Sequence, residues 1–266
     1  MAAAPQFSTR VSLVQVYATV SGTDGPVPTL AKDDFRVEEN GIPQEISVFT
    51  SGGGPLTIAV GIDRSFSIPP KQLRATVSAA RQFVERLTPD DQVMVMAIGS
   101  ENEVVAPLGT PRPRAADAIS RIDTWGSTPL HDAVVKAIDS VQSGTGRRAL
   151  VLLSDGSDRG SIASADDVVS YARRKDVLVY PVAVGRNQAP FFVELAAVTG
   201  ARSFAVADDS RLPRVLETIR EELRSQYLIG YESSVPAKAG ETWRSIRVTT
   251  RRPGVSVRAR DGYVPR

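Results

Sequence analysis

Hydrophobic residues follow two different patterns along the chain, and the change between them falls near Pro55. From Val11 to Val20, apolar and polar residues alternate with a period of two, which is typical of a strand with one face in water. Residues 33–49 indicate two further strands that meet at Asn40-Gly41, a dipeptide that favours a hairpin turn. We therefore expect antiparallel strands before Pro55.

After Pro55, continuous apolar runs alternate with segments in which apolar residues recur every three or four positions. The first pattern predicts strands buried on both faces, and the second predicts amphipathic helices. The expected strands are 56–63, 92–98, 149–154 and 177–184, with shorter ones near Val104 and at 202–206, and the expected helices are 71–87, 114–123, 130–141, 164–174, 190–199 and 210–225. This order predicts an α/β fold with a doubly wound, mostly parallel six-stranded sheet and helices on both faces.

Strand patterns return after Ser225. The segments 226–233, 243–250 and 254–260 indicate an antiparallel set, separated by turn residues at 236–240 and 252–254. We therefore expect three parts: N-terminal strands at 8–54, a Rossmann-like α/β domain at 55–224, and C-terminal strands at 225–266. The α/β domain would be inserted in a small β-sandwich that the N- and C-terminal strands form together.

Composition narrows the classes of function. The 266 residues are 42% hydrophobic and 23% charged, with a net charge of +2, so an ordinary globular protein without a nucleic-acid partner is expected. The chain has no cysteine, which excludes disulfides and thiolate chemistry. No apolar run reaches the roughly 18–20 residues of a membrane span. The start, MAAAPQFSTR, lacks the features of a signal peptide, so we expect any targeting segment to lie outside this chain.

Oxygen-bearing side chains stand where predicted strands end or a predicted helix begins. Asp63 ends the first apolar strand, and Ser65 and Ser67 follow it at alternate positions. Thr128 lies just before a predicted helix, and Asp155 follows another apolar strand. Because the carboxyl ends of parallel strands lie at one edge of a sheet, we expect these five side chains to converge there.

The chemistry of this set favours a hard divalent cation. Carboxylate and hydroxyl oxygens suit Mg²⁺, our first choice, with Mn²⁺ or Ca²⁺ as alternatives, whereas Zn²⁺ prefers His and Cys. Two serines at i and i+2 of an extended loop point the same way, so both can reach one ion. The set is too small to close a coordination shell, which leaves a position that a carboxylate from a partner could fill.

The segments DRSFS, GSTPLHDA and LLSDGSD, in that order, resemble the metal-ion-dependent adhesion site (MIDAS) of von Willebrand factor type A domains. The resemblance spans about Leu56 to Arg224, and the flanks at 11–20, 34–41, 227–231 and 260–263 resemble a bacterial branch of that family. It implies metal ligation by Asp63, Ser65, Ser67, Thr128 and Asp155. It further implies a non-enzymatic adhesion or assembly module that binds an acidic side chain of a protein partner. Because the bacterial branch is usually exported, it implies an extracytoplasmic location, secreted or periplasmic.

Several neighbouring residues depart from the family pattern or invite other roles. Arg64 and Phe66 stand where relatives often carry small residues; both are expected to point away from the ion, and the charge of Arg64 either weakens metal binding or recruits an acidic partner. For Phe66 we favour packing in the core over an exposed anchor. We favour His131 as an ordinary helix residue over a ligand or base, and Asp158 as a solvated residue over a second-layer contact.

Two other interpretations compete with the binding module. Aspartyl-phosphate phosphatases also end a strand in an aspartate, but their general acid is a carboxylate two residues on, where this chain has Ser65. Ser-His-Asp catalysis would depend on His131, the single histidine. The chain is therefore predicted not to be an enzyme. The other alternative is a structural or assembly domain whose metal site stays empty, with Asp63 bound to backbone N–H groups and Ser67 capping a helix.

Overall fold

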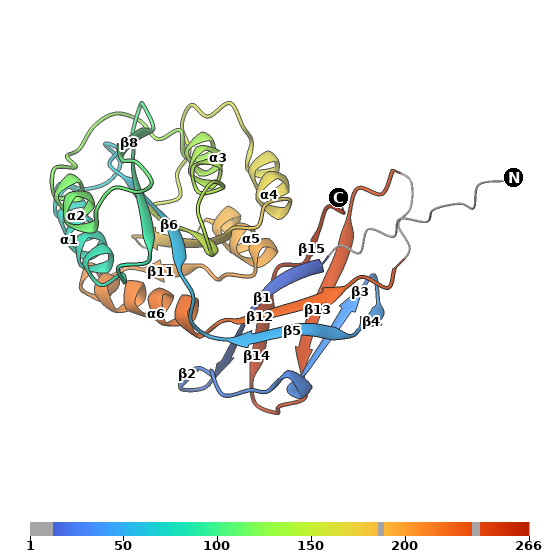
Figure 1. The fold of residues 1–266 in the computed structure, drawn as a ribbon. Helices are drawn as coiled ribbons and strands as arrows, with labels where there is room; N and C mark the ends of the chain where they lie inside the picture. Colours follow the sequence, from blue (N-terminus) through green and yellow to red (C-terminus); the bar gives the residue numbers. More distant parts are fainter. Residues whose placement is uncertain (1–12, 186–188, 236–239, 266) are drawn as a thin grey trace, which may run out of the picture.

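The structure is a computed structural model that describes residues 13–185, 189–235 and 240–265. It consists of an α/β domain and a smaller β-sandwich that lie side by side (Figure 1). The predicted fold class is confirmed, because the sandwich is built from strands near both ends of the chain and the α/β domain lies between them. The predicted strand residues Val11 and Ser12, and most of the predicted break at 236–240, lie outside the described residues.

The α/β domain is built on a six-stranded sheet in the order β11-β10-β9-β6-β7-β8. All of its neighbours pair in parallel except β7 and β8, which are antiparallel. The four long strands are apolar on both faces because helices cover both sides. The strands are β6 (Leu56–Asp63), β7 (Gln92–Ile98), β8 (Glu103–Ala106), β9 (Arg147–Ser154), β10 (Leu178–Val184) and β11 (Phe204–Val206).

Three helices pack on each face of this sheet (Figure 1). One face is covered by α1 (Pro70–Glu85), α2 (Arg112–Ser120) and α6 (Leu212–Ser225), and the other by α3 (Leu130–Ser140), α4 (Ala165–Arg173) and α5 (Pro190–Thr199). Four of them have proline in their first two positions, where its missing N–H costs no helical hydrogen bond. Five of the predicted helices differ from these by one to three residues at their ends, and the predicted helix at 190–199 matches α5.

The β-sandwich consists of two antiparallel sheets that share one apolar core. One sheet has the order β14-β1-β12-β5, with β2 paired to β1, and the other has the order β15-β13-β3-β4. The strands are β1 (Leu13–Gly22), β2 (Gly25–Pro26), β3 (Phe35–Glu39), β4 (Ile42–Gln44), β5 (Ile46–Ser51), β12 (Tyr227–Glu232), β13 (Arg244–Thr250), β14 (Ser256–Ala259) and β15 (Gly262–Tyr263). Short 3₁₀ helices occupy Lys32–Asp34 and Asp209–Arg211.

Two predictions about the sandwich strands are wrong. The segment 33–49 forms three strands: β3 and β4 make the hairpin at Asn40-Gly41, where both residues have positive φ, and β5 then pairs with β12 in the other sheet. The C-terminal strands do not form one antiparallel set either, since β12 and β14 both pair with β1 while β13 pairs with β3. Alternation indicates which face of a strand is buried, but it carries no information on which strand lies beside it.

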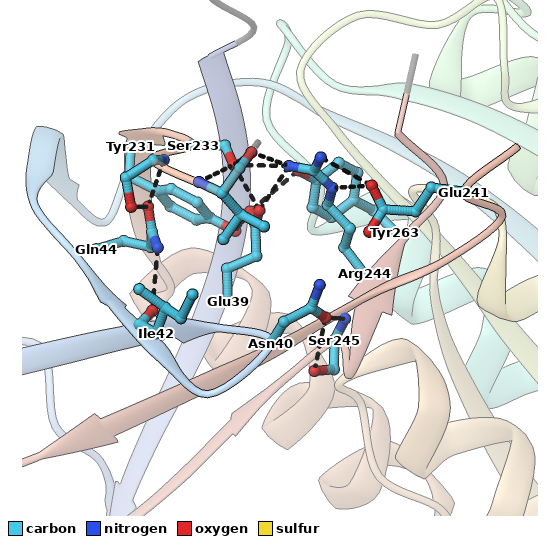
Figure 2. Close-up of polar contacts among 12 residues, drawn as sticks. Glu39, Asn40, Ile42, Gln44, Tyr231, Ser233, Glu241, Arg244, Ser245 and Tyr263 are labelled. Carbon is cyan, nitrogen blue, oxygen red and sulfur yellow. Dashed lines mark hydrogen bonds and ion pairs between the residues drawn. The ribbon is translucent and has the colours of Figure 1, made fainter. Parts of the chain in front are cut away.

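A buried ion pair inside the sandwich joins β3, from the N-terminal part of the chain, to β13, from the C-terminal part (Figure 2). Glu39, at the end of β3, accepts hydrogen bonds from Arg244 Nη1 at 2.8 Å and from the hydroxyls of Tyr231, Tyr263 and Ser233 at 2.8, 3.0 and 2.5 Å. Glu241 binds the same guanidinium at 2.8 Å. The carboxylate is therefore fully paired, as a buried charge must be to persist in a low-dielectric interior.

The junction between the two parts lies at the amino ends of the strands of the α/β sheet. Four residues, 52–55, lead from β5 into β6, and one residue, Gln226, separates α6 from β12. The buried Glu222 of α6 pairs with Arg202 at 3.0 Å and with Arg258 of β14 at 2.9 Å. The carboxyl ends of the strands, where Asp63 stands, therefore face away from the sandwich. No helix among the described residues has the length and apolar character to cross a membrane.

Candidate metal site

Asp63 is the buried centre of the candidate site, with 1% of its surface exposed at the end of β6. Its Oδ1 accepts the N–H of Ser65 at 2.9 Å, and its Oδ2 accepts the hydroxyl of Ser154 at 2.6 Å. Burial raises the pKa of the Asp63 carboxyl and nearby Asp155 raises it further, while the hydrogen bonds from Ser154 and Ser65 act in the opposite direction. A cation here would relieve the cost of burying this negative charge.

Ser65 and Ser67 lie together as predicted, but the predicted extended loop is wrong, because the N–H of Ile68 donates to the carbonyl of Ser65 at 3.0 Å and closes a turn. Their hydroxyl oxygens are 2.9 Å apart, and Ser65 is buried. The alternative role of Ser67 as a helix cap is wrong: α1 has Pro69 at its N-cap, and no side chain caps it. Asp63 does accept the backbone N–H that the same alternative assigned to it, so it serves the turn whether or not it also binds an ion.

Thr128 is held among three loops, here called the site loops: residues 64–69 after β6, 121–129 before α3, and 155–164 before α4. The first two are joined by hydrogen bonds from Trp125 N–H to the Arg64 carbonyl at 2.8 Å and from Phe66 N–H to the Gly126 carbonyl at 3.0 Å. The third is joined to the second by Arg159 N–H, which donates to the carbonyl of Thr128 at 2.7 Å. These bonds place Thr128, itself buried, on a loop directly adjacent to the other two.

Asp155 follows β9, and Ser154, the last residue of that strand, connects it to Asp63 by a hydrogen bond. The hydroxyl of Ser154 donates to Asp63 and accepts the N–H of Gly156 at 3.1 Å. Asp155 itself is half-buried, and its Oδ1 accepts the N–H of Ser157 at 2.8 Å. Ser154 is a contact that our sequence reasoning missed; its one signal was a hydroxyl at the end of the otherwise apolar run ALVLL.

Ser65 is buried, whereas the side chains on either side of it, Arg64 and Phe66, lie against Glu103 and in solvent, respectively. Arg64 extends to Glu103, with Nη2 and Oε2 2.9 Å apart, and its guanidinium lies 5.2 Å from the centre of the Trp125 ring. The prediction that Phe66 packs in the core is wrong, since 74% of its surface is exposed. Residues 65–68 form a turn, in which the N–H of Ile68 donates to the carbonyl of Ser65 at 3.0 Å, and Phe66 lies at the exposed bend of that turn.

His131 and Asp158 form hydrogen bonds with each other and with other residues of the site loop 155–164. His131 is a residue of α3, as predicted, with its Nδ1 3.1 Å from the carbonyl oxygen of Ala163. The prediction of a solvated Asp158 is wrong, because its carboxylate accepts the N–H of His131 at 3.0 Å and the hydroxyl of Ser161 at 2.6 Å. Burial alone would raise the pKa of Asp158, but these hydrogen bonds outweigh it and the pKa lies below its usual value.

The donor set fits a hard divalent cation. It offers two carboxylates, Asp63 and Asp155, and three hydroxyls, Ser65, Ser67 and Thr128, which are the oxygen ligands that Mg²⁺, Mn²⁺ and Ca²⁺ take in proteins. Within 13–185, 189–235 and 240–265, no three side chains of the His, Cys, Asp or Glu type gather to hold a metal. A site here therefore depends on its hydroxyls, and on ligands from outside the chain.

Comparisons with known proteins agree with the fold. A family model described as the von Willebrand factor type A domain matches residues 58–221. Proximal thread matrix protein 1 from the mussel byssus has a solved structure with a TM-score of 0.56 and 17% identity, over 70% of this chain and 51% of that one. A second structure of it, with a zinc-occupied MIDAS motif, gives a TM-score of 0.54 at 17% identity, over 70% and 49% of the two chains.

A bacterial structure is similar over its whole length. BatB from Bacteroides thetaiotaomicron has a TM-score of 0.50 at 16% identity, over 65% of this chain and all of that one. The chain spans about half the length of the mussel protein, and at such identities the likeness shows the fold alone. A comparison with curated proteins finds no match.

Proposed function

We propose, because this chain belongs to the von Willebrand factor type A domain family, that it is a non-enzymatic module that binds a protein partner through a divalent cation. Domains of this family are generally interaction modules, and their metal sites bind divalent cations. The proposed ligands are Asp63, Ser65, Ser67, Thr128 and Asp155. The observation that carries the proposal is the closed set of hydrogen bonds that joins the three site loops around the buried Asp63.

Each residue has a role that its surroundings support. Asp63 supplies a negative charge that its burial leaves in need of a counter-charge, and Ser154 and the Ser65 N–H fix the direction of its carboxylate. Asp155 supplies the second negative charge from the rim of the site, and the hydroxyls complete the protein's share of ligands without adding charge. When bound, the cation would offer an open position to an acidic side chain of the partner.

We propose Mg²⁺ as the ion, with Mn²⁺ and Ca²⁺ as alternatives. The mussel protein has been seen with zinc at its MIDAS, so Zn²⁺ belongs in the test. We further propose the division at residues 8–54, 55–224 and 225–266, with the sandwich as the support of the α/β domain, and an extracytoplasmic location. An enzymatic role has no support at position 65, where a phosphatase of the aspartyl-phosphate type would need a carboxylate.

A structural or assembly domain with an empty metal site is the alternative, and one observation favours it. Both oxygens of Asp63 already accept hydrogen bonds, so the buried carboxylate has partners without an ion. The two candidates differ in whether a cation binds at all, which makes ion binding the decisive measurement.

Titration of the chelator-stripped chain with Mn²⁺, followed by the electron paramagnetic resonance signal of the free ion, tests the proposal. The wild type is expected to remove one equivalent of Mn²⁺ from solution, with Mg²⁺ competing, and Asp63→Ala to remove none. Asp166→Asn is the matched control, because it removes one negative charge from an exposed position at the start of α4. Equal Mn²⁺ binding by wild type and Asp63→Ala would refute the assignment.

A further inference from the structure

Each of the three site loops carries one large apolar side chain in water. Phe66, Trp125 and Ile162 are 74%, 42% and 98% exposed. The other large apolar side chains exposed in the described part of the chain are Leu13, Ile42, Val193 and Val264, which lie in the sandwich, in α5 or near the C-terminus. Exposed apolar residues scattered singly are normal, but here one stands on each of the three loops of a single site, which sets these three apart from the others.

The backbone under Phe66 and Trp125 is fixed. The two hydrogen bonds between their loops, Trp125 to Arg64 and Phe66 to Gly126, hold these neighbouring segments side by side. The indole ring of Trp125 is covered on one face by the guanidinium of Arg64, which Glu103 holds in place. Both apolar side chains are thus presented by an ordered surface, which lowers the entropy cost of binding a partner.

Ile162 is presented in the same way. Its N–H donates to Asp132 Oδ2 at 2.9 Å, and the N–H of Ala163 donates to Asp132 Oδ1 at 3.0 Å. On the other side, the hydroxyl of Ser161 accepts the N–H of Asp132 at 3.2 Å and donates to Asp158. These bonds hold the loop backbone on both sides of the fully exposed isoleucine.

We infer that Phe66, Trp125 and Ile162 form an apolar rim around the candidate metal site, and that the rim binds a protein segment in which the acidic residue is flanked by apolar side chains. The inference rests on the proposed function, since the acidic residue is the one that would complete the ion's coordination. The hydrogen bonds between Phe66 and Gly126 and between Arg159 and Thr128 place the rim residues on loops that adjoin the ligands.

The charge of the site loops favours such a segment over an anionic polymer. The loops carry three basic residues, Arg64, Arg121 and Arg159, and three acidic ones, Asp123, Asp155 and Asp158. One of the basic side chains, Arg64, is already paired with Glu103. A polyanion would need many unpaired positive charges along its path, whereas one carboxylate set among apolar side chains needs a single cation and the rim.

Selection from a random-peptide phage library tests this partner class. The full chain is immobilised in Mg²⁺, and bound phage are eluted with EDTA. The inference predicts eluted peptides with an Asp or Glu that is flanked by Leu, Ile, Phe or other large apolar residues. Synthetic versions of them are then titrated against variants by fluorescence anisotropy.

The variants separate the rim from the ion. Ile162→Ser and Phe66→Ser are each expected to weaken binding about tenfold, the effect of losing part of the burial of one large apolar side chain. Ile42→Ser, which removes the same kind of side chain from a 47% exposed position in the sandwich hairpin, is expected to leave affinity unchanged. All three positions are exposed, and matching melting curves would verify that each variant folds.

The outcomes distinguish the inference from the proposed function. Selected peptides that bind Asp63→Ala as well as wild type would overturn the proposed metal-dependent function. Peptides that depend on Asp63 but lack flanking apolar residues, or bind the two rim variants with wild-type affinity, would overturn the rim alone. A chain that binds Mn²⁺ but yields no EDTA-eluted peptide would also overturn the rim as the docking surface for such segments.

Discussion

Replacement of Arg244 by methionine is expected to destabilise the sandwich strongly. The guanidinium of Arg244 is buried and gives Glu39, also buried, its one cationic partner among the described residues. Methionine has a similar length, so the change removes the charge and the hydrogen bonds while leaving most of the volume filled. Glu39 would then keep the three hydroxyl donors Tyr231, Tyr263 and Ser233 around an uncompensated negative charge.

The magnitude follows from these contacts. Removing one partner of a buried ion pair costs about 3–5 kcal/mol, and the three remaining donors place Arg244→Met near the lower end, about 3 kcal/mol. Tyr263→Phe removes one hydrogen bond to a charged acceptor from a half-buried position and is expected to cost about 1.5 kcal/mol. Arg247→Met is the matched control, because Arg247 lies on the same strand β13 with its side chain exposed, where substitutions usually cost under about 0.5 kcal/mol.

Urea unfolding in the presence of EDTA, followed by far-ultraviolet circular dichroism, measures these differences. The wild type is expected to have the highest urea midpoint, with Arg247→Met close to it, Tyr263→Phe lower and Arg244→Met lowest. The slope of the unfolding free energy against urea concentration is expected to be similar for all four proteins. Equal midpoints for Arg244→Met and Arg247→Met would refute the reasoning, since they would show that the pair contributes nothing beyond an exposed arginine.

Three further predictions concern the site loops and the junction. Gly126→Ala is expected to weaken Mn²⁺ binding, because Gly126 has φ 81° and an added Cβ would lie 2.4 Å from the backbone nitrogen of Ser100; wild-type affinity in the same titration would contradict this. Glu222→Gln is expected to destabilise the chain by about 1–3 kcal/mol in urea unfolding, because Arg202 and Arg258 lose their shared anion, with the exposed Glu221→Gln as its control. Asp158→Asn is expected to melt below wild type at pH 7, with the difference shrinking on acidification. Because the pKa of Asp158 is lowered in the folded chain, its carboxylate stabilises the fold at pH values above the ordinary aspartate pKa of about 3.9. This stabilisation is lost as the pH falls through the pKa of Asp158 in the folded chain. A difference in melting temperature that stays constant down to about pH 3 would contradict the prediction.

The α/β domain could be predicted well from the sequence because its signals are local. The runs at 56–63 and 92–98 match β6 and β7 residue for residue, and the helix at 190–199 matches α5. Each of these segments is buried in a way that its own pattern of apolar residues records. The convergence of Asp63, Ser65 and Ser67 followed from the same logic, since it depends on the end of one strand.

The features that could not be predicted depend on partners that are far away in sequence. Glu39 and Arg244 are 205 residues apart, and nothing in the pattern around Glu39 indicates that a charged residue points into the sandwich core. Phe66 lies in a turn at 65–68 that is bonded to Gly126 of another loop, and the role of Ser154 depends on its contact with Asp63 at the end of the neighbouring strand. Such contacts are properties of tertiary structure, and a single sequence does not carry them.

Thermal unfolding in EDTA and in Mg²⁺, Mn²⁺ and Ca²⁺, with wild type and Asp63→Ala side by side, tests the proposed metal site most directly. An ion that binds only the folded chain at a hundred times its dissociation constant stabilises it by about 2.7 kcal/mol, which corresponds to a shift of several degrees for a protein of this size. The proposed site predicts that shift in the wild type with at least one of the ions, and no shift in Asp63→Ala. A wild type whose melting is unaffected by every ion, or an equal shift in Asp63→Ala, would contradict it.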